Sequence, residues 1–225
     1  MDVQIFYMLA FLVGIFLLLF LNDQLHKRFG IASEYTRKLA HFSATGSTLT
    51  FPLLFTSHWY PFVLALVFFL ILLLSMNTKY LKSIHEIDRY SAGSFLLPPA
   101  IYLPFLFSVK AGDPFFFILP TLILAVSDPL AGLAGYIFRE GNPKIVLFSR
   151  QLNKTIYGSS TFFVSAFVLS LIALSVNTHH LGGDTLMAAL FLASATTVTE
   201  MLSPGGTDNI TVPAMTILVL SLYRL

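Results

Sequence analysis

Eight mostly apolar stretches, separated by short polar segments, follow one another along the chain: Ile5–Leu21, Leu39–Phe55, Pro61–Met76, Phe95–Val109, Phe115–Phe138, Thr161–Val176, Leu186–Met201 and Ile210–Tyr223. A helix needs about 20 residues to cross the hydrocarbon core of a bilayer, so several of these stretches are short. The second and seventh are rich in Ser, Thr, Gly or Ala, which is typical of helices buried among other helices. The pattern predicts an all-α polytopic membrane protein with about eight transmembrane helices, forming a single integral membrane domain over residues 1–225.

Basic residues are unevenly distributed among the connections between these stretches. The first, third and fifth connections carry Lys27, Arg28, Arg37, Lys38, Lys79, Lys82, Arg89, Arg139, Lys144, Arg150 and Lys154, whereas the others carry only Lys110. The positive-inside rule then predicts that the odd-numbered connections are cytoplasmic and that the N-terminus is outside. Asp2 precedes the first stretch and no small-residue cleavage site follows it, so we expect a retained span rather than a signal peptide.

Composition supports the membrane class and excludes several others. Of the 225 residues, 56% are hydrophobic and only 11% are charged, about half of what a soluble domain carries. The net charge of +2 is too small to indicate a nucleic-acid partner, and the absence of cysteine excludes disulfides and thiolate metal sites.

Asp128 is the first candidate for chemistry, because it lies inside an apolar stretch. A carboxylate within a span costs about 3 kcal/mol on insertion. The following Pro129 lacks an N–H group and frees a backbone carbonyl, which often kinks or breaks a helix. One interpretation is that Asp128 binds Mg²⁺, which prefers oxygen ligands and keeps several of its waters. The alternative is an acid that pairs with a lysine and stabilises the bundle.

A second polar group, Lys154-Thr155-Ile156-Tyr157-Gly158-Ser159, stands just before the sixth apolar stretch. A lysine, two hydroxyl groups, a glycine that allows close backbone approach, and the free N–H groups of a helix start are features that bind phosphate. The run is not a Walker loop, because Gly-x-x-x-x-Gly-Lys-Ser/Thr is absent. The alternative is a juxtamembrane lysine followed by an ordinary helix start.

The third polar group runs from Glu200 to Pro213, between the last two apolar stretches. Its Pro-Gly-Gly turn exposes backbone N–H groups that can hold an anion. Asp208 is a candidate second metal ligand, oriented by Asn209; the alternative is that Asp208 only caps the last helix.

Arg37 and His41 begin the second apolar stretch and lie four residues apart, on one face of a helix. They are candidates for contacting a phosphate or a substrate hydroxyl. Lys38 alone is interpreted as a membrane anchor. The run His85-Glu86-Ile87-Asp88-Arg89 is interpreted as a solvated, self-paired loop.

Together these groups resemble the dolichol kinase and phytol kinase group, which is related to the phosphatidate cytidylyltransferases. The resemblance covers about residues 37–213 and rests on Ser127-Asp128-Pro129-x-Ala131, Lys154-Thr155-x-x-Gly158-Ser159, Glu200-x-x-Ser203-Pro204-x-x-x-Asp208-Asn209-x-Thr211-Val212-Pro213 and the earlier Arg37-Lys38-Leu39-x-His41. It implies a polytopic membrane enzyme that uses a cytidine or similar nucleotide with Mg²⁺ on a lipid substrate.

The two branches of the group differ in a late loop. The cytidylyltransferase branch carries His-Gly-Gly-x-x-Asp-Arg-x-Asp there, whereas this chain has Pro204-Gly205-Gly206-Thr207-Asp208-Asn209. The histidine, the arginine and the second aspartate are missing, which favours the kinase branch.

The sequence therefore predicts a membrane lipid kinase whose active site faces the cytoplasm. It would transfer a phosphoryl group from a nucleoside triphosphate, CTP by preference, to a long-chain alcohol such as phytol, a polyprenol, dolichol or diacylglycerol. The predicted catalytic residues are Asp128, Lys154, Asp208 and His41; the predicted phosphate-binding residues are Arg37, Lys154, Thr155, Gly158, Ser159 and Asn209; the predicted Mg²⁺ ligands are Asp128 and Asp208. The general base is Asp128, Asp208 or His41.

Two alternatives stay open from the sequence. One is a phosphatidate cytidylyltransferase that makes CDP-diacylglycerol. The other is a small transporter in which Asp128 relays protons or ions.

Overall fold

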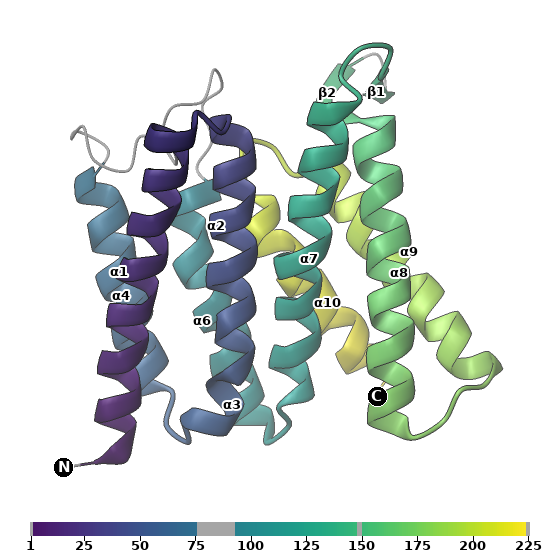
Figure 1. Cartoon of the computed structure of the whole chain (residues 1–225). Helices are drawn as coiled ribbons and strands as arrows, with labels where there is room; N and C mark the ends of the chain where they lie inside the picture. Colours follow the sequence, from purple (N-terminus) through teal and green to yellow (C-terminus); the bar gives the residue numbers. More distant parts are fainter. Residues whose placement is uncertain (1, 76–92, 148–149, 224–225) are drawn as a thin grey trace.

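The apolar stretches form helices that pack side by side and run alternately in opposite directions (Figure 1). The computed structural model describes residues 2–75, 93–147 and 150–223. Its elements are α1 (Val3–Phe29), α2 (Ser33–Ser47), the 3₁₀ turn η1 (Thr48–Thr50), α3 (Phe51–Leu54), α4 (Trp59–Ser75), α6 (Gly93–Ala111), α7 (Phe115–Ile137), β1 (Lys144–Leu147), β2 (Arg150–Thr155), α8 (Ile156–Thr178), α9 (Gly183–Leu202) and α10 (Asp208–Tyr223).

Five of the described helices, α1, α6, α7, α8 and α9, are long and apolar enough to cross a membrane. Two more, α4 and α10, are apolar but shorter. The predicted polytopic helical class is therefore confirmed, while the count of eight spans and the outward N-terminus stay predictions. Several helices begin before the apolar stretch that predicted them; α2 starts at Ser33 and α8 at Ile156. Apolarity marks where a helix meets lipid, whereas its first turn is decided by caps and polar contacts.

One element departs from the predicted all-α class. Strands β1 and β2 form an antiparallel hairpin in which Lys144 pairs with Thr155 and Val146 with Gln151. The hairpin stands at the same end of the bundle as the connection between α9 and α10 (Figure 1). It connects α7 to α8 and carries Lys154 on its second strand. The all-α prediction therefore missed this hairpin.

Helix α7 occupies the middle of the bundle and separates two apolar cores. On one side, Leu119 and Ile123 of α7 pack with residues of α8, α9 and α10 such as Phe162, Leu192 and Leu220. On the other side, an aromatic cluster joins α7 to α1, α3, α4 and α6. Because α7 packs on both sides, its polar residues are held at a fixed depth between the two halves.

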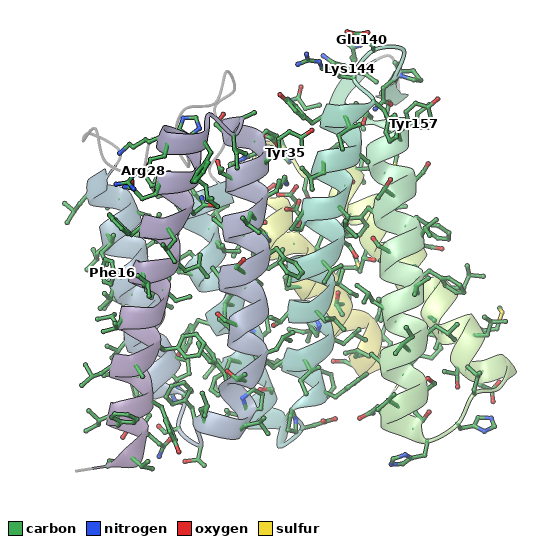
Figure 2. All side chains as sticks on the ribbon, viewed as in Figure 1. Phe16, Arg28, Tyr35, Glu140, Lys144 and Tyr157 are labelled. Atoms are coloured by element: carbon green, nitrogen blue, oxygen red, sulfur yellow. The ribbon has the colours of Figure 1, made fainter. Side chains whose placement is uncertain are left out.

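Polar and apolar side chains segregate along the bundle in the manner of a membrane protein. Figure 2 shows Arg28, Glu140 and Lys144 at the end that carries the hairpin, with Tyr35 and Tyr157 near the same end, whereas Phe16 projects outward lower on α1. Tyrosine is typical of the membrane–water interface.

The topology can be tested by cysteine labelling, because the chain contains no cysteine. Helix α8 has 23 residues, which corresponds to about 34 Å, enough to cross the hydrocarbon core. Cysteines introduced singly at Lys144 and His179 are therefore expected to react with impermeant maleimide from opposite sides, Lys144→Cys from the cytoplasm and His179→Cys from outside. Labelling of both from one side would contradict the arrangement. Lys79, a third informative position, lies outside the described residues.

Candidate active site

A cavity of about 530 Å³ lies within the bundle and is lined by residues from α1, α2, α4, α6, α7, β2, α8, α9 and α10. One face of α2 lines the cavity along the length of the helix, through Glu34, Arg37, Lys38, His41 and Ala44, and Thr48 of η1 continues this face. The three- and four-residue spacing places these side chains above one another on the helix. The face changes from charged to apolar along the helix, and the cavity therefore has a charged part and an apolar part.

The charged part contains a first ion cluster around Asp128 of α7. The Lys38 ammonium lies 3.1 Å from Oδ2 of Asp128 and 3.4 Å from its backbone oxygen. Both side chains are largely buried, with 11% of Lys38 and 14% of Asp128 exposed. The interpretation of Lys38 as a membrane anchor was therefore wrong. Asp128 and Lys38 neutralise each other within the bundle, which offsets the cost of burying each charge.

His41 completes this first cluster. Its Nε2 lies 3.0 Å from the Leu124 carbonyl oxygen, and its Nδ1 lies 3.8 Å from Oδ2 of Asp128. A carbonyl oxygen only accepts hydrogen bonds, so Nε2 carries the proton and donates it there. In the neutral imidazole Nδ1 is then free of hydrogen and can accept a proton beside a carboxylate.

Glycine makes room for this cluster on α7. A Cβ atom at Gly132 would overlap the side chain of Lys38. Gly132 lies one turn after Asp128, on the same face of the helix. The close passage of Lys38 over α7 therefore depends on the absence of a side chain there. Pro129 does not break the helix, since α7 continues to Ile137.

A second ion cluster surrounds Lys154 at the end of β2. Its ammonium group lies 2.7 Å from Oδ2 of Asp208 and donates a second hydrogen bond to Oε1 of Glu200. Ser159 donates to the other oxygen of Glu200 at 3.3 Å. Burial alone would lower the pKa of Lys154, but the carboxylates of Asp208 and Glu200 outweigh it and raise that pKa above its ordinary value. Lys154 is therefore a permanent cation at physiological pH.

The first turn of α8 differs from the expected phosphate cradle. The Ile156 N–H donates to the Pro143 oxygen at 3.1 Å, the Tyr157 N–H to Oδ1 of Asn142 at 3.2 Å, and the Gly158 N–H to Oγ1 of Thr155 at 3.2 Å. The prediction that these N–H groups are free was wrong, because the chain folds back through the hairpin and caps its own helix. The phosphate-binding roles of Thr155, Gly158 and Ser159 stay predictions.

Gly158 allows the start of α8 to pack closely against other protein atoms rather than against a ligand. A Cβ atom there would lie 3.0 Å from Oγ1 of Thr155 and 3.1 Å from the Ala131 oxygen of α7. The glycine thus lets α8 approach the α7 backbone three residues after Asp128.

The turn between α9 and α10 closes the charged part of the cavity. Gly205 and Gly206 line it and have φ values of 57° and 89°. These left-handed conformations favour glycine over other residues. Asn209 donates from its side-chain nitrogen to the Gly93 oxygen at 2.6 Å, which ties the start of α10 to the start of α6. The neighbouring carboxylate of Asp208 is thereby held toward Lys154.

The structure brings all the predicted site residues to one cavity: Arg37, His41, Asp128, Lys154, Thr155, Gly158, Ser159, Asp208 and Asn209. Arg37 is already paired there, its guanidinium lying 2.8 and 3.0 Å from the oxygens of Glu34. The run His85–Arg89 lies outside the described residues.

Sequence reasoning assigned no chemical role to four charged residues of the site, Glu34, Lys38, Arg139 and Glu200. Glu200 is only 3% exposed and lies near the end of an apolar helix. The argument that singled out Asp128, the cost of a carboxylate within an apolar helix, applies equally to Glu200. Lys38 had no such signal, because a lysine at the start of an apolar stretch is the usual sign of an anchor.

Among the described residues, no group of three acidic or histidine side chains is gathered closely enough to hold a metal ion alone. Mg²⁺ commonly binds through only one or two carboxylates, several waters and the substrate's phosphates. Glu200 and Asp208 fit that requirement, because both contact the same lysine nitrogen and therefore lie near each other.

Comparison with known proteins supports a lipid-kinase group. The chain is 28% identical over 181 residues to a phytol kinase of Synechocystis sp., an alignment that covers 80% of this chain and 76% of that protein. No family model matches the chain, and no solved structure matches it. The chain is thus a distant homologue of phytol kinase.

Proposed function

We propose that this protein is a membrane lipid kinase that transfers the γ-phosphoryl group of a nucleoside triphosphate, CTP by preference, to the hydroxyl group of a long-chain alcohol. The observation that best supports this proposal is that one cavity contains both the Lys154 and Asp128 clusters and an apolar part lined by Ile15 and Leu64. A lipid alcohol has the matching shape, one polar end on a long apolar chain. The similarity to a phytol kinase supports an isoprenoid alcohol in particular.

Charge in the cavity supports a requirement for a divalent cation. Among the described residues, four basic ones line it, Arg37, Lys38, Arg139 and Lys154, and four acidic ones, Glu34, Asp128, Glu200 and Asp208. This described part of the lining is formally neutral with His41 uncharged, and a triphosphate would add negative charge to it. Mg²⁺ held by Asp208 with Asp128 or Glu200 would neutralise phosphate oxygens and position them for transfer.

Lys154 is the residue best placed to stabilise charge that develops on the phosphates. Phosphoryl transfer depends mainly on positioning and on charge neutralisation. When a nucleotide binds, its oxygens would compete with Glu200 and Asp208 for the lysine, and the released carboxylates would become available to Mg²⁺. Lys154, Glu200 and Asp208 would thus pair with one another in the empty site and bind phosphate and Mg²⁺ in the occupied site.

His41 is the best of the three candidates for the general base. Its Nδ1 is the acceptor nitrogen, and Asp128 lies beside it to stabilise the imidazolium that forms. In this proposal His41 takes the proton of the alcohol as its oxygen attacks the γ-phosphorus, and the nucleoside diphosphate leaves. The alcohol's tail would enter sideways between helices and occupy the apolar part of the cavity.

Labelled CTP distinguishes the proposed kinase from a cytidylyltransferase. With purified full-length protein, Mg²⁺ and phytol, label at the γ-phosphorus is expected to appear in a lipid monophosphate, because the kinase breaks the bond to that phosphorus. Phosphatidate in place of phytol serves as the matched control and is expected to remain unlabelled. Recovery of the γ-label only in pyrophosphate, with cytidine joined to the lipid, would replace the proposal by the cytidylyltransferase reaction.

A further inference from the structure

The apolar part of the cavity extends away from the ion clusters. Its lining comes from α1, α4 and α6, and from Ala44, Thr48 and Phe51 on the α2 side. From Arg37 to Thr48 the helical rise corresponds to about 16 Å. Phe51 is the last lining residue on this side, one turn beyond Thr48, so the apolar part begins near the ion clusters and extends toward Phe51.

Phe51 is held firmly in that place. Its ring centroid lies 4.9 Å from Phe11, 5.9 Å from Phe105 and 6.1 Å from Phe117, which belong to α1, α6 and α7. Only 3% of Phe51 is exposed. Rings packed from three helices cannot turn aside without opening the core, since protein interiors are close-packed.

Among the residues that the structure describes, the apolar part has no polar side chain that is available to a polar ligand. Thr48 is its one hydroxyl-bearing lining residue on α2 and η1, and its Oγ1 donates to the Thr45 oxygen at 2.6 Å. The charged groups all lie at the other part, around Asp128 and Lys154. A bound alcohol is therefore oriented with its hydroxyl at the ion clusters and the end of its tail at Phe51.

We propose that Phe51 closes the tail site and sets the upper limit on the length of alcohol that the protein accepts. This inference rests on the proposed lipid kinase function. A tail longer than the distance from the ion clusters to Phe51 has to displace the aromatic cluster or leave its hydroxyl short of the phosphate. Each methylene that does not fit costs about tenfold or more in kcat/KM.

The experiment compares substrate length profiles of the wild type, Phe51→Leu and Phe51→Ala. The substrates are geraniol, farnesol, phytol and solanesol, isoprenoid alcohols of increasing length. The wild type is expected to lose about tenfold or more in kcat/KM at the first alcohol too long for the site. Both variants are expected to move that loss to a longer alcohol, because removing the ring opens space beyond Thr48. Phe51→Leu is included because it keeps most of the buried apolar volume if Phe51→Ala unfolds.

Phe117→Leu is the matched control. Phe117 belongs to the same cluster and is fully buried, with its ring stacked on that of Phe51, but it does not line the cavity. It is expected to lower thermal stability to a similar degree and to leave the length profile unchanged. A profile that Phe51→Leu leaves unchanged, or that Phe117→Leu shifts equally, would overturn the inference.

A binding measurement separates this inference from the proposed function. The same alcohols are titrated into wild type and variants without nucleotide, and affinity is read from stabilisation against heat. Tail-length dependence that shifts in Phe51→Leu supports the tail site even if no phosphorylation occurs, in which case only the kinase proposal fails. If the affinity for the alcohols depends neither on their length nor on the residue at position 51, the tail site is overturned even if the protein is a kinase.

Discussion

Lys154→Met is expected to lower turnover by about a hundredfold or more while weakening nucleotide binding much less. The ammonium group would stabilise charge that develops on the transferred phosphoryl group, and loss of one such electrostatic donor costs about 10²–10³ in kcat. Lys154→Arg is expected to restore little, because the planar guanidinium does not replace a compact ammonium between Asp208 and Glu200. The measurement is kcat and KM for CTP with a fixed lipid alcohol.

The effect of Lys154→Met on the stability of the protein has to be separated from its effect on turnover. Glu200 and Asp208 are 4% and 12% exposed at their side chains, so removing their common partner leaves two buried carboxylates without a cation. Removing one partner of a buried pair costs about 3–5 kcal/mol. The double variant Lys154→Met/Glu200→Gln removes one of these charges and is expected to recover stability but not turnover.

Lys144→Met is the matched control for Lys154, because Lys144 is exposed and lies on the neighbouring strand opposite Thr155. It is expected to keep full activity. A folded Lys154→Met protein with turnover close to that of the wild type would remove Lys154 from the proposed chemistry.

Lys154 is not expected to contribute to any pH dependence near neutrality. Its folded-state pKa lies above the ordinary lysine value of about 10.4, because Asp208 and Glu200 outweigh the effect of burial. Its contribution to stability is therefore fully present below the unfolded pKa and is lost only as the pH rises through the higher folded pKa.

Asp128→Asn is expected to lower turnover by about a hundredfold or more. Asp128 would stabilise the charged form of the base His41 and would also be a ligand of Mg²⁺. Mg²⁺ is also expected to stabilise the wild type with CTP against heat more than it stabilises the variant. The measurements are turnover over a Mg²⁺ series and thermal unfolding in detergent with and without the cation.

The structure also predicts how this substitution affects folding. A buried acid replaced by its neutral isostere would hold or raise stability if the acid had no partner. Here Lys38 is 11% exposed and would lose its carboxylate, so a cost of up to about 3 kcal/mol is expected. Lys38→Met/Asp128→Asn is expected to regain stability without regaining turnover.

Asp113→Asn serves as the control at the start of the same helix. Asp113 lies just before α7 and accepts a hydrogen bond from the N–H of Phe115, the first residue of that helix, at 2.8 Å. Asparagine caps a helix about as well as aspartate, so turnover and stability are expected to remain near those of the wild type. Full turnover of Asp128→Asn at every Mg²⁺ concentration would remove Asp128 from both metal binding and base activation.

The helical elements and most of the site residues could be predicted from the sequence, because their signals are local. Long apolar stretches can cross a bilayer only as helices or closed barrels, since backbone groups in lipid must bond within the structure. Asp128 stood out because a carboxylate within such a stretch is costly. The residues around Lys154 and Asp208 stood out as polar runs amid apolar sequence.

The hairpin and the capped start of α8 could not be predicted in this way. Residues 144–155 contain an apolar run of only four residues, Ile145–Phe148, which is far too short to cross a bilayer. Their pairing depends on which backbone groups of the two strands meet. The N–H groups of Ile156 and Tyr157 bond to Pro143 and Asn142, which return to them only once the hairpin has formed. Capping of these two N–H groups is therefore a consequence of hairpin formation, whereas Thr155 caps the Gly158 N–H locally, as in an ordinary helix start.

The pairing of charges was decided by the tertiary structure alone. Lys38 and Asp128 are 90 residues apart, and Lys154 and Glu200 are 46 apart. The sequence determines which helices carry charged residues, but which charges meet depends on the rotation and depth of each helix. Those are set by packing, here by Gly132 making room for Lys38 and by Gly158 bringing α8 against α7. Lys38, which looks like an anchor along the chain, instead pairs with the buried acid Asp128, and Gly132 leaves room for its side chain beside α7.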